Sequence, residues 1–323
     1  MDQTNDIGDA ARSAIEQRAL SVGKWGNLFM GVAGVIAAWL SHSQALLMDG
    51  LFSAIGFVSA VLAARVSLSA SLPPDDRRPL GYAADESIYK MFRSLSLICL
   101  VVFATANALL NIVAYASGDH IPELQYGPII VYFVVIIIAC TAIAANHHFA
   151  WKKTGSRSDV LKLETRAAVF DGMVTLAAAI GLGVMPFLKG GPMGWIAPIG
   201  DSVIVLFLCS LVAGRYWSDF KAGLGELAGV SAAKGAVSTA RRVLSDIAEK
   251  AGGTLVDLSV LKLGRQYQVV FYFAPGTAIS AAEADALSQK CQTALAPSLG
   301  QAVVAVLITK QGRHLGQPAS NAE

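Results

Sequence analysis

The sequence is poor in charged residues and has no paired cysteines. Lys, Arg, Asp and Glu make up only 15% of its 323 residues, whereas a typical soluble domain carries about 25%. The formal net charge of +2 gives no reason to expect nucleic-acid binding. The four cysteines are isolated, with no CxxC pair, so we predict neither a disulfide framework nor a thiolate metal site. No nucleophile–base set or phosphate-binding loop is present, which makes an enzyme the least favoured class.

Long apolar runs dominate the first two thirds of the chain, and 54% of all residues are hydrophobic. A transmembrane helix needs roughly 20 predominantly apolar residues. By this criterion we predict six membrane helices, over Trp25–Leu40, Ala45–Val66, Leu95–Tyr115, Gly127–Ala150, Ala167–Leu188 and Ile196–Ala213. The first 20 residues are polar and charged, so we expect no removable signal peptide.

Basic residues gather on one side of the six predicted helices. They precede the first helix (Arg12, Arg18, Lys24), flank the loop after the second (Arg65, Arg77, Arg78, Lys90, Arg93) and flank the loop after the fourth (Lys152, Lys153, Arg157, Lys162, Arg166). The loops on the other side hold only Lys189. Because cytoplasmic loops carry the excess of Lys and Arg, we predict an integral protein of the cytoplasmic (inner) membrane with both termini in the cytoplasm.

In the last third of the chain, charged residues are scattered among apolar ones as in a soluble domain. A helical pattern covers residues 237–252, an alternating pattern turns over near Gly264, a second amphipathic helix covers 280–299, and a final strand covers 302–309. We therefore predict a small α-β-β-α-β cytoplasmic domain over residues 218–312. It follows a six-helix domain over residues 23–217. A cytoplasmic tail (1–22) and a disordered tail (313–323) complete the predicted organisation.

Three aspartates lie inside the apolar runs: Asp49, Asp171 and Asp201. A carboxylate at the centre of a membrane helix costs about 2.5–3.5 kcal/mol, and such residues usually mark an ion or proton path. Ser53 is four residues after Asp49 and shares its helix face, whereas Ala167, four residues before Asp171, offers nothing to a cation. Asp201 stands near the external start of its helix, where a role as N-cap is the alternative.

Two carboxylates, a hydroxyl and water or backbone oxygens suit a hard divalent cation. Ionised carboxylates bind such an ion and protonated ones release it, which is the simplest physical basis for proton antiport. These residues predict a secondary transporter in which Asp49, Ser53 and Asp171 bind a divalent metal ion, with Asp201 as an optional fourth ligand. Alternating access of the helices around this site would then move the ion.

The architecture and several segments together resemble the cation diffusion facilitator (cation efflux) family. The segments are SQALLMDGLFS in the second helix, RPLGYAADESI before the third, AAVFDGMVT in the fifth and GLGELAGVS after the sixth. The resemblance implies six membrane helices, cytoplasmic termini and a metallochaperone-like C-terminal domain. It also implies a homodimer that exports a divalent metal from the cytoplasm against protons.

The sequence departs from the family at its ligand positions. Ser53 and Ala167 stand where the family usually has Asp or His, so half of the membrane ligand set is replaced. Arg78, Tyr82 and Asp285 stand where peripheral histidines are expected, so we expect no peripheral zinc sites and no cofactor beyond the transported metal. An all-oxygen site suits manganese, magnesium or iron(II) better than zinc.

Two other readings stay open. The incomplete site is compatible with transport of a different cation or a proton-linked solute. It is also compatible with a non-transporting or regulatory membrane-anchored homodimer.

Overall fold

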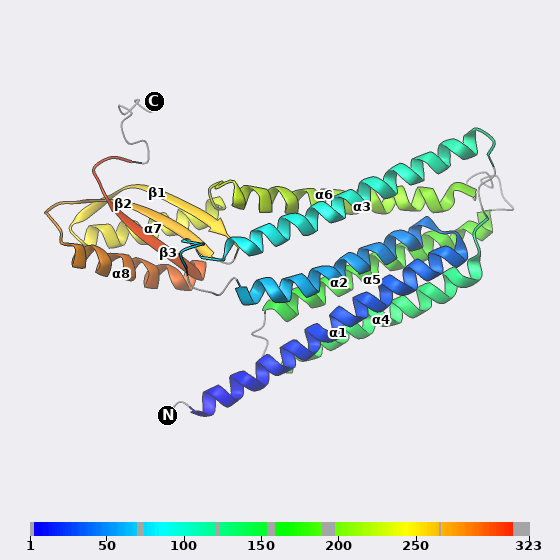
Figure 1. Cartoon of the computed structure of the whole chain (residues 1–323), viewed down its shortest axis with the longest axis horizontal. Coiled ribbons are helices and arrows are strands. Elements are labelled where there is room, and N and C mark those ends of the chain that lie inside the picture. Colours follow the sequence, from blue (N-terminus) through cyan, green and yellow to red (C-terminus); the bar gives the residue numbers. More distant parts are fainter. Residues whose placement is uncertain are drawn as a thin grey trace. The chain divides into compact units, whose positions relative to one another are not determined.

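The computed structural model describes residues 3–69, 74–79, 81–119, 123–153, 159–188, 198–264 and 266–312. Its six long helices are α1 (Gln3–Ser41), α2 (Gln44–Ser69), α3 (Ala84–Ala116), α4 (Tyr126–Lys153), α5 (Asp159–Leu188) and α6 (Gly200–Leu227) (Figure 1). Each contains a stretch long and apolar enough to cross a membrane, which confirms the six predicted spans. The predicted disordered tail lies outside the described residues.

The helices extend beyond their apolar parts. Helix α1 begins at Gln3, within the predicted tail, although its membrane-length stretch starts only at Gln17. Polar and charged residues such as those before Gln17 are tolerated in a helix that continues into water. The chain divides into two compact units, residues 1–62 with 93–218 and residues 63–92 with 219–323. The C-terminal end of α2 and the N-terminal end of α3 therefore belong to the same compact unit as the C-terminal domain.

Within the first unit, small residues let α1 and α2 touch. A Cβ atom on Gly34 of α1 would lie 2.4 Å from the Cα atom of Gly50 on α2, and one on Gly31 would lie 3.1 Å from the backbone nitrogen of Ala54. In lipid, helices associate through close packing rather than through the hydrophobic effect, so small residues at such contacts are favourable. This contact fixes the position of α2 relative to α1 at Gly50, the residue after Asp49.

Sulfur-containing side chains pack between two further pairs of helices, α1 with α4 and α2 with α6. Cys140 of α4 packs with its Sγ 3.6 Å from the Sδ of Met30 on α1, and its Cβ would lie 3.4 Å from a Cβ on Gly172 of α5. Cys209 of α6 lies with its Sγ 3.7 Å from the Sδ of Met48 on α2. Both cysteines are free and buried.

The second unit contains the predicted α-β-β-α-β domain, which the structure confirms. Its elements are α7 (Lys234–Lys250), β1 (Gly253–Leu263), β2 (Gln266–Pro275), α8 (Ala281–Leu299) and β3 (Gln301–Ile308) (Figure 1). Strand β2 lies in the middle of the sheet, antiparallel to β1 and parallel to β3. Gly264 ends the hairpin's first strand with φ +56°, a conformation that glycine adopts without steric cost.

Both helices of this domain cover one face of the sheet. Helix α7 contacts β1, α8 contacts β3, and the two helices contact each other. Leu244, Phe271, Phe273 and Leu295 are fully buried between these layers. Cys291 is buried in the same core, and its burial raises the pKa of the thiol to about 11.

Three segments of the second unit meet at Glu226, in the GLGELAGVS segment at the end of α6. Its Oε2 accepts a hydrogen bond from the Ser87 hydroxyl of α3 at 2.5 Å and one from the Gly264 amide at 3.2 Å. Its Oε1 lies 3.6 Å from the Nζ of Lys262. Glu226 thus ties the C-terminal end of α6 to the start of α3 and to the β1–β2 turn.

The loop before α3 is organised around Asp75. Its carboxylate accepts hydrogen bonds from the Tyr82 hydroxyl at 2.6 Å and from the Arg78 amide at 2.7 Å. The hydrogen bond from Tyr82 is the main cause that holds the pKa of Asp75 below its ordinary value. Arg78 forms an ion pair with Asp85 and stacks 4.6 Å from the centre of the Tyr82 ring. The two residues at the expected histidine positions therefore pack against each other and bond to carboxylates.

Candidate metal site

Asp49 lies on α2, where side chains from two other helices reach its carboxylate. The Tyr132 hydroxyl of α4 donates a hydrogen bond to Oδ2 at 2.7 Å, and Thr175 Oγ1 of α5 lies 3.4 Å from Oδ1. Tyr132 and Thr175 are only 4% and 2% exposed, while Asp49 is half-buried. Helices α2, α4 and α5 therefore converge on this carboxylate.

Asp171 lies on α5 one helical turn before Thr175. Its carboxylate interacts electrostatically with Asp49 and also with Arg93 of α3 and Arg215 of α6. The charges of both aspartates act on the Cys140 thiol of α4. Asp171 is exposed, and its relation to Asp49 is an interaction between charges. The structure thus brings the two aspartates of the predicted site into one electrostatic environment.

Ser53 follows Asp49 by one turn on α2 and is half-buried. Its position on the same helix face agrees with the spacing that made it a candidate. In the part of the chain that the structure describes, no three His, Cys, Asp or Glu side chains come together to hold a metal ion.

Asp201, the predicted optional ligand, is engaged elsewhere. Its Oδ2 accepts a hydrogen bond from the Gln44 amide at 2.6 Å, and its Oδ1 accepts bonds from the Ser43 hydroxyl at 2.6 Å and the Ala45 amide at 3.3 Å. These donors form the N-terminus of α2, whose first amides have no partner within the helix. Asp201 is 6% exposed. Instead of capping its own helix, as the alternative proposed, its carboxylate caps the start of α2 from α6.

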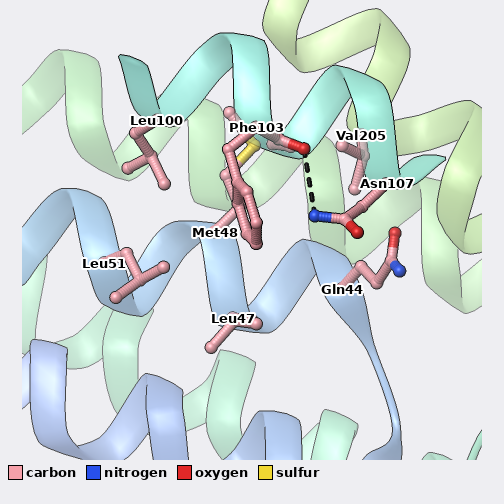
Figure 2. Close-up of a pocket in the computed structure, with 9 residues that line it drawn as sticks. Gln44, Leu47, Met48, Leu51, Leu100, Phe103, Asn107 and Val205 are labelled. Atoms are coloured by element: carbon pink, nitrogen blue, oxygen red, sulfur yellow. Dashed lines mark hydrogen bonds between the residues drawn. The ribbon is translucent and has the colours of Figure 1, made fainter. Parts of the chain in front are cut away.

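A cavity of about 170 Å³ lies on the other side of α2, between α2, α3 and α6. Figure 2 shows the amides of Gln44 and Asn107 together at one end of it, and apolar side chains such as Phe103 lining the remainder. Asn107 donates a hydrogen bond to the Phe103 carbonyl at 3.1 Å, within its own helix (Figure 2). Among the described residues, Gln44 Oε1 is buried without a hydrogen-bond partner. Met48 faces this cavity, while its neighbour Asp49 bonds to α4 and α5.

Reasoning from sequence missed Tyr132 and Thr175 as site residues. Tyr132 stands inside an apolar span, and a phenol there needs a hydrogen-bond partner when it is buried. Thr175 stands four residues after Asp171, on the same helix face, whereas the family's ligand position, here Ala167, lies four residues before it. Counting four residues in both directions from each aspartate would have found the threonine.

Comparison with known proteins agrees with this architecture. The family model described as "Cation efflux transmembrane domain" matches residues 21–228, so the chain belongs to the cation efflux family. It is an integral membrane protein of a family of metal-cation exporters. The chain is also 23% identical over 188 residues to the manganese efflux system protein MneP of Bacillus subtilis (strain 168). That match covers 57% of this chain and 59% of the relative, so the chain spans about three fifths of the length of the curated relative it matches.

Proposed function

We propose that this protein exports a divalent metal cation from the cytoplasm in exchange for protons, through a site built on Asp49 and Asp171. The observation that carries the proposal is the electrostatic interaction of these two carboxylates, one on α2 and one on α5. Both lie on helices within the segment that matches the cation efflux transmembrane domain. Ser53, one turn from Asp49, is proposed as a weak neutral ligand.

The charges around the two aspartates support exchange of a cation for protons. Arg93 and Arg215 offset part of the negative charge while the site holds no metal. A divalent cation needs both carboxylates ionised, and protonation of either one weakens its binding. A proton gradient directed into the cell then drives release of the metal ion on the external side of the membrane. Movement of helices around this site provides the alternating access.

The orientation of the protein follows from its basic residues. Lys and Arg cluster at the helix ends that flank the second and fourth loops. From this bias we propose that the protein lies in the inner membrane with both chain termini in the cytoplasm. The small C-terminal domain then lies on the cytoplasmic side. As in the family that the chain resembles, we propose that this domain holds a homodimer together.

Manganese is the substrate that we favour. The donors around Asp49 are carboxylate, hydroxyl and phenol oxygens, and oxygen donors prefer manganese and magnesium over zinc. The relative from Bacillus subtilis is named a manganese efflux protein. Asp201 is proposed as a structural cap of α2, not as a metal ligand, because three hydrogen bonds already occupy its carboxylate.

Metal uptake into proteoliposomes under an imposed pH gradient tests the proposal. Manganese, iron(II), cobalt, zinc and cadmium are compared for the wild type, Asp49→Asn and Asp171→Asn. Asp246→Asn, which changes an exposed aspartate of α7, is the matched control. We expect manganese flux that depends on the pH gradient, disappears in both membrane variants and is unchanged in the control.

The second candidate is a non-transporting membrane-anchored homodimer. It is favoured by the replacement of two family ligands with Ser53 and Ala167. A folded, correctly inserted protein that carries none of the five ions would reject the transport proposal and support this alternative.

A further inference from the structure

A hydroxyl on α5 stands where it can extend the pair of carboxylates. Thr175 follows Asp171 by four residues, so both side chains lie on one face of α5. Its Oγ1 is 3.4 Å from Oδ1 of Asp49 on α2, and the residue is 2% exposed. The threonine therefore shares a helix face with Asp171 and contacts Asp49 of the neighbouring helix.

The geometry at Asp49 assigns different surroundings to its two oxygens. The Tyr132 hydroxyl bonds to Oδ2 at 2.7 Å, the length of an ordinary O–H···O hydrogen bond. The Tyr132 ring is itself fixed by an edge contact with Phe133, with ring centres 5.6 Å apart. Oδ2 is thus held toward α4, which leaves Oδ1 directed at Thr175.

The longer distance at Oδ1 has the length expected between two ligands of one metal ion. An octahedral ion with metal–oxygen distances of about 2.1 Å places adjacent ligand oxygens about 3.0 Å apart, and the larger Ca²⁺ places them about 3.3–3.7 Å apart. The 3.4 Å between Thr175 Oγ1 and Asp49 Oδ1, a long hydrogen bond from the threonine hydroxyl, lies within the Ca²⁺ range, and a smaller ion such as Mn²⁺ would draw the two oxygens a few tenths of an ångström closer. An ion can therefore bridge these two oxygens with little movement of either helix.

We propose that Thr175 is a direct metal ligand, and that Tyr132 is a positioning residue that directs Asp49 Oδ1 into the site. This inference rests on the proposed function, since it adds a third protein oxygen to Asp49 and Asp171. The hydroxyl on the C-terminal side of Asp171 compensates for Ala167 on its N-terminal side. Three oxygens completed by water suit a hard cation such as Mn²⁺.

A soft-metal reading of the same region is less well supported. Cys140 and Met30 place two sulfur atoms 3.6 Å apart near the aspartates. However, among the described residues Cys140 does not group with Asp49 and Asp171 into a set that could hold a metal. The sulfur pair packs α1 against α4, and the oxygen atoms of Thr175 and Asp49 face each other.

Substitutions of Thr175 test the ligand role in the purified full-length protein. Thr175→Val removes the hydroxyl with almost no change of shape, Thr175→Ser keeps it, and Thr175→Cys replaces it with sulfur. We expect Mn²⁺ affinity, measured by titration calorimetry, to fall about tenfold in the valine variant and less than threefold in the serine variant. The cysteine variant should gain Cd²⁺ affinity at least tenfold relative to the wild type, and Cys140→Ser should leave the Mn²⁺ affinity unchanged.

Tyr132→Phe tests the positioning role in proteoliposomes. Lost positioning raises the KM for Mn²⁺ and lowers its selectivity over Zn²⁺, whereas mere damage to folding lowers only the maximal rate. The inference alone is overturned if wild-type protein transports Mn²⁺ and Thr175→Val matches it, with no gain of Cd²⁺ affinity in Thr175→Cys. If the wild type transports no divalent cation, the proposed function is overturned, and this inference with it.

Discussion

The carboxylate of Asp201 offers a direct test of a cap that acts between helices. In Asp201→Ala, the Ser43 hydroxyl and the Gln44 and Ala45 amides lose their acceptor in a buried environment. Hydrogen bonds between membrane helices contribute about 0.6 kcal/mol each, and removal of an N-cap costs about 0.5–2 kcal/mol. We expect Asp201→Ala to lower the free energy of unfolding by about 1–3 kcal/mol, since the two amide bonds are themselves the cap and the Ser43 bond adds to it.

The assay is SDS titration of the folded protein in mixed micelles, followed by far-UV circular dichroism. Asp201→Asn keeps one acceptor oxygen and should lose less stability than Asp201→Ala. Ser43→Ala should cost less in the Asp201→Ala background than in the wild type, because the bond it removes is already absent. Mn²⁺ affinity should stay within twofold of wild type in all of these variants. Unchanged stability together with a tenfold loss of Mn²⁺ affinity in Asp201→Ala would refute the cap and identify Asp201 as a ligand.

Three further predictions concern packing, pH and thiol reactivity. Gly34→Ala should destabilise the protein by about 1–3 kcal/mol by overpacking the contact with Gly50, whereas Gly183→Ala, with open space around its Cβ, should not, as measured by SDS titration. Since the pKa of Asp75 is lowered in the folded loop, its contribution to stability is present above its unfolded pKa and is lost as pH falls through the folded pKa. Cys291, buried with its thiol pKa raised to about 11, should resist N-ethylmaleimide at pH 7.5 until the domain unfolds.

The measurement for Asp75 is hydrogen exchange of residues 74–85, corrected for the intrinsic rate at each pH. Protection of these backbone amides from exchange should be full above about pH 5 and should decline on acidification. In Asp75→Ala the same amides should be unprotected at every pH. A flat wild-type profile would contradict the role assigned to this carboxylate. Mass spectrometry of the alkylated peptide measures Cys291, and rapid modification in the folded protein would contradict its burial.

The sequence by itself determined the elements and the class of protein. Runs of roughly 20 apolar residues predict membrane helices because the bilayer thickness sets a local length requirement. Period-two alternation on both sides of Gly264 likewise predicts a hairpin from neighbouring residues alone. The predicted six spans and the α-β-β-α-β order therefore agree with the structure. Helix α1 begins before its predicted span and α6 continues after its own, because hydropathy does not report on a helix once it leaves the membrane.

Only the tertiary structure decided which side chains meet. Asp49 finds its partners in Tyr132 and Thr175, and Asp201 finds its own in residues 43–45, more than 80 positions away in each case. Such contacts depend on how each helix is rotated and shifted against its neighbours. Close approaches such as that of Gly34 to Gly50 set this rotation. The spacing of residues along one helix defines a face, but the packing of the other helices determines what that face contacts.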